Sequence, residues 1–167
     1  MKDSKVIIGI IVATLIILGG GTVLLGGKST NNTPEVLSQV EGIEAVPTFY
    51  NLGDVPIGGG LVTKEYAIKN TSNGKINLKK ITTSCMCTTA SVQIGGKETK
   101  FFGMEGHGDA NPPVNIEINA GEEGKVIVIF DPAAHGPQGV GPFNRVVYLT
   151  FSDPAGIKEL TFSGKVI

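Results

Sequence analysis

The sequence contains no tryptophan, and only 6% of its 167 residues are aromatic. Charged residues are also few, at 17%, and 14 basic against 15 acidic side chains leave a formal net charge of −1. Such a chain has no basic field that would attract the phosphates of a nucleic acid. The chain also has few aromatic rings on which the bases of a single-stranded nucleic acid could stack. We therefore expect no nucleic-acid partner.

Residues that carry catalysis are scarce as well. There are two histidines, His107 and His135, and neither stands at a recognisable spacing from a nucleophile for a hydrolytic triad. Glycines 58–60 resemble a phosphate loop, but no Lys-Ser or Lys-Thr pair follows at the required spacing. The sequence therefore predicts a protein that is not an enzyme and needs no cofactor.

The most prominent feature that is present is an uncharged apolar run at residues 6–25. A helix of that length spans about 30 Å, which is the thickness of one hydrocarbon core. Lys2 and Lys5 precede the run and favour a cytoplasmic N-terminus. We therefore predict that residues 1–27 form a cytoplasmic tip and one transmembrane helix, which anchors a single-pass protein in the cell membrane and leaves its C-terminal domain extracytoplasmic.

Two other interpretations of this run remain open. A cleaved signal sequence would end among the small residues at 19–27, although no A-x-A pattern marks a cleavage site there. A pilin-like subunit would carry a glutamate inside the apolar helix, and residues 6–25 contain no acidic side chain.

The rest of the chain divides into a linker and a β domain. Polar residues and Pro34 characterise residues 28–44, as expected of a linker. In residues 45–167 apolar side chains recur at every second position, for example at Tyr66 and Ile68. The apolar run at 126–130 is typical of a central strand that is covered on both faces. About seven such segments, separated by turns, predict an all-β antiparallel sandwich.

A set of landmarks in residues 49–166 adds a resemblance to a known family. They are Leu52-Gly53-Asp54-Val55, Asn70-Thr71, Ser84-Cys85 with Cys87-Thr88, Ala120-Gly121 and Gly164. In this order they resemble the bacterial family catalogued as domain of unknown function 1573, an immunoglobulin-like (Ig-like) sandwich related to Hydin-type domains. Met86 stands where that family usually has glycine, and residues 95–113 look like a longer insertion. The resemblance implies an Ig-like fold and no established reaction.

Cys85 and Cys87 are the only cysteines. Alternate residues of a strand face the same side, so we expect both thiols to point together. The preferred interpretation is structural, as a small buried pair, and a disulfide between them is left open because the compartment outside the cytoplasm permits one. A regular strand holds such residues near the upper limit for bridging, so that disulfide would need a local bulge.

Two chemical alternatives apply to the same pair. A redox pair is one, although the Cys-x-x-Cys spacing and helix N-terminus of disulfide oxidoreductases are missing. The other is a Cu(I) site, in which Cys85 and Cys87 would be joined by Met104 and His107, since soft sulfur ligands suit that ion. Met86 would point to the opposite face of the strand and is therefore not one of these expected ligands.

These observations predict a membrane-anchored, extracytoplasmic Ig-like domain that acts as a non-enzymatic binding or scaffold module. It would contact the membrane through residues 6–25, and its partner would be another protein or an envelope component. The alternative is an extracytoplasmic copper-binding or thiol-redox domain that uses the Cys-x-Cys pair.

Overall fold

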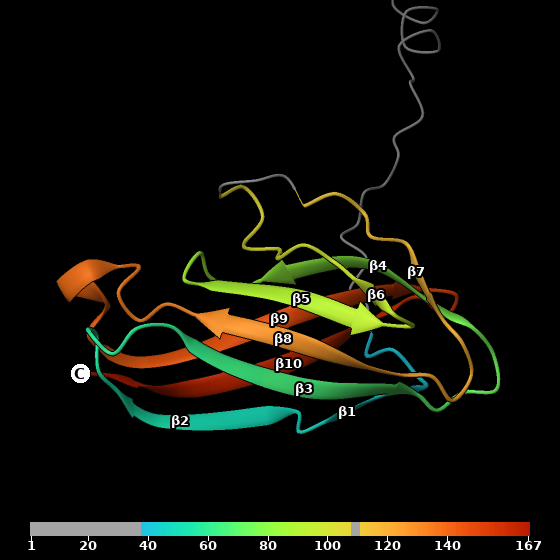
Figure 1. Ribbon diagram of the computed structural model, residues 1–167, viewed down its shortest axis with the longest axis horizontal. Coiled ribbons are helices and arrows are strands. Elements are labelled where there is room, and N and C mark those ends of the chain that lie inside the picture. The colour runs from blue at the N-terminus through green and yellow to red at the C-terminus, as the bar shows by residue number, and fades with distance from the viewer. Residues whose placement is uncertain (1–37, 108–110) are drawn as a thin grey trace, which may run out of the picture. The chain divides into compact units, whose positions relative to one another are not determined.

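The computed structural model describes residues 38–107 and 111–167, which form two β-sheets of five strands each (Figure 1). The strands are β1 (Ile43–Val46), β2 (Phe49–Val55), β3 (Val62–Asn70), β4 (Ile76–Thr83), β5 (Thr88–Ile94), β6 (Lys97–Glu98), β7 (Ile116–Ile118), β8 (Glu123–Phe130), β9 (Gly141–Ser152) and β10 (Gly156–Val166), with a short 3-10 helix at Gly136–Gly139. The all-β prediction is confirmed for these residues.

The strand order is that of an Ig-like sandwich. One sheet runs β1-β3-β8-β5-β6 and the other β2-β10-β9-β4-β7. The first four strands of the first sheet correspond to strands A, B, E and D of an immunoglobulin constant-type domain, and β4, β9 and β10 correspond to C, F and G. Most consecutive strands therefore lie in different layers, although β5 and β6 share the first sheet and β9 and β10 share the second. This arrangement brings distant parts of the chain together at each end of the sandwich.

Two details differ from the sequence prediction. The described residues form ten strands rather than about seven. The first strand is divided between the sheets as β1 and β2, and the short strands β6 and β7 lie in the segment between β5 and β8. The sandwich is also not wholly antiparallel, since β2 pairs with β10 in parallel. A strand that crosses from one sheet to the other keeps its direction and meets a different neighbour, and this accounts for the parallel pair.

The period-two pattern correctly identifies the core. Tyr66 and Ile68 on β3, and Leu160 and Phe162 on β10, are all at most 2% exposed. Tyr66 also joins the two sheets, because its hydroxyl donates a 2.9 Å hydrogen bond to the Thr161 carbonyl on β10. Burial raises the pKa of this hydroxyl, which keeps it protonated as a donor.

The apolar run at 126–130 is covered less completely than predicted. It forms the end of β8, which lies between β3 and β5. Val126 and Val128 face the core and are at most 1% exposed, but Ile127 and Ile129 on the other face are only partly buried. The outer face of this sheet has no covering layer among the described residues, so only one set of side chains enters the core.

The β domain begins before residue 45. Val40 is buried, its amide donates to the Ile157 carbonyl, and β1 starts at Ile43. The end of the predicted 28–44 linker therefore belongs to the sandwich. No helix within residues 38–107 and 111–167 is long and apolar enough to span a membrane. The predicted anchor at 6–25 lies outside the described residues.

Candidate functional site

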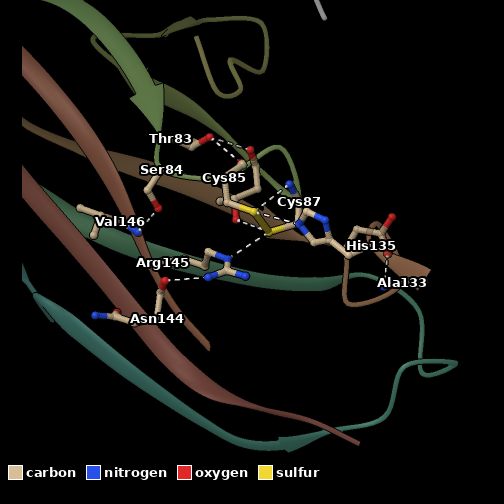
Figure 2. The surroundings of a disulfide bond; sticks show 11 residues. Thr83, Ser84, Cys85, Cys87, Ala133, His135, Asn144, Arg145 and Val146 are labelled. Atoms are coloured by element: carbon tan, nitrogen blue, oxygen red, sulfur yellow. Dashed lines mark hydrogen bonds between the residues drawn. A yellow bond between two sulfur atoms is a disulfide. The ribbon is translucent and has the colours of Figure 1, made fainter. Parts of the chain in front are cut away.

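Cys85 and Cys87 lie in the four-residue connection between β4 and β5 (Figure 2). Because β4 and β5 belong to different sheets, this connection crosses from one layer to the other. The crossing requires a tight turn, which a 3.1 Å hydrogen bond from the Thr88 amide to the Cys85 carbonyl closes. The prediction that both cysteines sit on one strand is therefore wrong, since the sheet change interrupts the strand between them.

The turn brings the two cysteines together as a disulfide. Their Cα atoms are 5.3 Å apart, within the usual range for bridged pairs. The two sulfurs differ in their surroundings. Cys87 is 4% exposed and belongs to the hydrophobic core, whereas Cys85 is partly exposed at its edge. The bridge therefore has one buried end and one end near the surface.

Hydrogen bonds hold the loop independently of the disulfide. The Thr83 hydroxyl contacts the carbonyls of Cys85 and Thr88, at 3.0 Å each. The Asp131 amide donates to the Cys87 carbonyl at 2.9 Å. On the β9 side, the amide of Val146 donates to the Ser84 hydroxyl at 2.9 Å. The loop is thus fixed to both sheets, through its backbone carbonyls and through the Ser84 side chain.

Two side chains with positive or basic character approach the sulfurs from separate segments (Figure 2). His135 precedes the 3-10 helix, and its Nε2 lies 3.2 Å from Cys85 Sγ. Arg145 comes from β9, and its Nε donates a 3.1 Å hydrogen bond to Cys87 Sγ. The disulfide therefore has an imidazole at its exposed end and a guanidinium at its buried end.

Arg145 is held in place for this contact. Its Nη1 donates a 2.9 Å hydrogen bond to the Asn144 carbonyl, and its guanidinium lies over the Phe143 ring at 5.7 Å from the centroid. Partial burial lowers the pKa of Arg145, although an arginine still keeps its charge near neutral pH. A positive charge is therefore fixed beside Cys87.

The predicted copper ligands do not all meet. Met104 and His107 line a hollow of about 310 Å³ together with Met86, and neither cysteine contributes to its lining. The atoms that do gather are those of Cys85, Cys87 and His135, which lie within 4.8 Å of one another. The predicted set of Cys85, Cys87, Met104 and His107 is therefore corrected, because the turn places the sulfurs beside the 131–140 segment.

Sequence reasoning missed His135 and Arg145 as neighbours of the cysteines. They lie 50 and 58 residues further along the chain, and no local pattern connects them to the Cys-x-Cys motif. One signal was available, since Arg145 is the only arginine of the chain and stands inside a strand whose apolar residues alternate. The rarity of arginine and the position of Arg145 in a strand do not indicate which side chain Arg145 contacts.

Comparisons with known proteins concern the fold alone. No protein-family model matches the sequence, and no curated protein gives a significant match. The resemblance of residues 49–166 to domain of unknown function 1573 therefore stays a prediction. A solved protein of unknown function from Porphyromonas gingivalis W83 is similar with a TM-score of 0.53 and 17% identity, over 81% of this chain and 51% of that chain.

Two weaker likenesses accompany it. The VesB protease of Vibrio cholerae has a TM-score of 0.48 at 17% identity, over 75% of this chain and 32% of that one. The PapD-like domain 7 of human CEP192 has a TM-score of 0.45 at 10% identity, over 84% of this chain and 97% of that one. This chain thus spans about half the length of the Porphyromonas protein and a third of VesB.

Proposed function

We propose that this protein is a membrane-anchored, extracytoplasmic binding or scaffold module, whose sandwich contacts another protein or an envelope component through the loops at one end. That end, which we call the disulfide end, consists of residues 56–61, 84–87 and 131–140. β3 and β5 start there and β8 ends there, since both Val62 and Thr88 pair with Phe130 (Figure 1).

The exposed apolar side chains of these loops support the proposal. Leu61 is 65% exposed, and Met86 and Val140 are each 52% exposed. Each belongs to a different loop of the disulfide end. Exposing large apolar side chains to water is unfavourable in free energy, and a binding partner that covers them removes this exposure. Loops on a rigid scaffold are the usual place for binding residues. This shared location is the observation that favours a binding surface here.

Site-specific photo-cross-linking tests the binding surface. A photoreactive residue replaces Leu61, Met86 or Val140 in turn, in cells that naturally make the protein. We expect all three positions to give the same cross-linked product. A probe at exposed Lys97 on β6 is the control, because β6 pairs with the far end of β5. Different products from the three loops, or the same product from Lys97, would contradict the proposal.

Protease accessibility tests the anchor. The uncharged run at 6–25 supports a transmembrane helix, and the lysines before it support a cytoplasmic N-terminus. Protease added to intact spheroplasts should remove the chain beyond about residue 28 and leave the N-terminus protected. A mature protein that begins near Lys28 would instead show a cleaved signal sequence.

A Cu(I) site is the second candidate function, and the cluster of Cys85, Cys87 and His135 supports it. After reduction, two thiolates and an imidazole would offer soft and borderline ligands to Cu(I). Titration of the reduced protein with Cu(I) should then raise its melting temperature by mass action. The Cys85→Ala/Cys87→Ala variant should lose this rise, and Met104→Leu/His107→Ala should keep it. No rise in the wild type would exclude the copper function.

A further inference from the structure

The disulfide between Cys85 and Cys87 has features that a purely structural bridge does not need. It closes a loop of only three residues, so its effect on the entropy of the unfolded chain is near the minimum for a disulfide. The loop is already held by the hydrogen bonds of Thr83 and Asp131. Reduction would therefore leave the two thiols close together in a loop that keeps its place.

The two sulfurs are also unequal toward an incoming thiolate. In thiol–disulfide exchange a thiolate attacks one sulfur and the other leaves, so access to each sulfur and the acidity of the leaving thiol decide the rate. Cys87 is 4% exposed, whereas Cys85 is partly exposed at the protein surface. Access therefore favours attack on Cys85.

The surroundings of Cys87 favour its departure. Arg145 Nε donates to Cys87 Sγ at 3.1 Å, and the Thr88 hydroxyl lies 3.6 Å from the same sulfur. A neighbouring guanidinium stabilises a thiolate and lowers the pKa of the thiol. A leaving thiol of lower pKa departs faster. The guanidinium of Arg145 thus provides a positive charge beside the sulfur that leaves as a thiolate.

We propose that Cys85–Cys87 is a thiol–disulfide exchange site for a protein that carries two neighbouring thiols. A partner thiolate attacks Cys85 Sγ, the bond between Cys85 and Cys87 breaks, and Cys87 leaves as a thiolate held by Arg145. The second partner thiolate then attacks the partner sulfur of the mixed disulfide and releases Cys85. The partner dithiol is oxidised to a disulfide, and Cys85 and Cys87 take up its two electrons and two protons.

His135 has a role at the exposed end. Its Nε2 is 3.2 Å from Cys85 Sγ, and the side chain is exposed to solvent. When Cys85 is released in the second step, the imidazolium form can donate a proton or pair with the thiolate. The site therefore contains an attacked sulfur beside an imidazole and a leaving sulfur beside a guanidinium. This proposal does not depend on the binding surface, since it concerns the chemistry of the disulfide itself.

Reduction by dithiothreitol tests the role of Arg145. The full-length protein in a mild detergent is equilibrated with mixtures of reduced and oxidised dithiothreitol, and free thiols are counted by alkylation and mass spectrometry. We expect Arg145→Gln to slow reduction at least tenfold and to shift the equilibrium about tenfold toward the disulfide, which corresponds to about 30 mV. Lys97→Gln, which removes one charge at the far end of β5, should stay within twofold of the wild type.

Arg145→Lys provides a second variant in case Arg145→Gln does not fold, because it keeps the charge and loses the Nε–H donor. We expect it to slow reduction at least threefold. Melting curves establish that each variant is folded. Wild-type rates and equilibria in the folded arginine variants would overturn the proposal, as would a wild-type disulfide that dithiothreitol does not reduce without unfolding.

Single-cysteine variants test which sulfur reacts. In Cys87→Ala the remaining Cys85 thiol should form a mixed disulfide with oxidised glutathione at least ten times faster than the Cys87 thiol does in Cys85→Ala. His135→Ala should slow the reaction of Cys85 in the first variant and leave that of Cys87 in the second unchanged. Equal rates for the two thiols, or a faster Cys87, would refute the assigned direction of attack.

Discussion

Asn70 offers a sharp test of how the two sheets are joined. It is the last residue of β3 and is fully buried. Its Nδ2 donates to the carbonyls of Gly74 and Ile118, at 2.8 and 2.9 Å. Its Oδ1 accepts from the amide and the hydroxyl of Ser72, at 3.0 and 2.7 Å. One side chain therefore shapes the β3–β4 turn and connects it to β7 in the other sheet.

We expect Asn70→Ala to lower the free energy of unfolding by about 2–4 kcal/mol. The buried Ile118 carbonyl would lose this donor, which costs about 1–3 kcal/mol, and the bonds to Gly74 and Ser72 contribute about 1 kcal/mol more. Asn70→Asp should be at least as harmful. It keeps the acceptor for Ser72 but turns a carboxylate toward two carbonyl oxygens.

Urea unfolding of the full-length protein, followed by far-ultraviolet circular dichroism, measures both variants. With a slope of about 1–3 kcal/mol per molar urea, the loss should move the midpoint by roughly 1 M or more. Asn73→Ala is the matched control, since Asn73 is exposed in the same turn and should change stability by less than about 0.5 kcal/mol. If Asn70→Ala also stays within that margin, the buried amide does not connect the sheets as described.

Two further predictions concern packing, and the same unfolding assay checks both. In Gly164→Ala the new Cβ would lie 2.7 Å from the Gly53 carbonyl oxygen, so we expect a loss of about 1–3 kcal/mol, whereas Gly58→Ala, with nothing within 4 Å, should be nearly neutral. Phe130→Ala should cost about 3–5 kcal/mol because the ring is 3% exposed, and Ile129→Ala on the partly buried outer face should cost less. If Gly164→Ala and Gly58→Ala lowered the free energy of unfolding equally, or if Phe130→Ala and Ile129→Ala did, the described packing would be contradicted.

Local sequence patterns determined which side chains enter the core. Tyr66 and Ile68 were predicted to share the apolar face of one strand, and both are buried. The physical reason is local, because successive side chains of any strand point to opposite sides whatever the neighbouring strands are. The same reasoning indicated an all-β sandwich, since segments with one apolar face must pack that face against another sheet.

Tertiary structure alone decided which strands become neighbours and what surrounds the cysteines. The parallel pairing of β2 with β10 and the passage of the chain from β4 to β5 depend on the arrangement of whole sheets. Because the chain crosses between the sheets at this point, Cys85 and Cys87 lie in a loop closed by a disulfide and not on one strand as predicted. The fold then brings His135 and Arg145 to the two sulfurs from 50 and 58 residues away. Contacts at such separations depend on the packing of distant segments, and the residues next to each cysteine in the sequence carry no information about it.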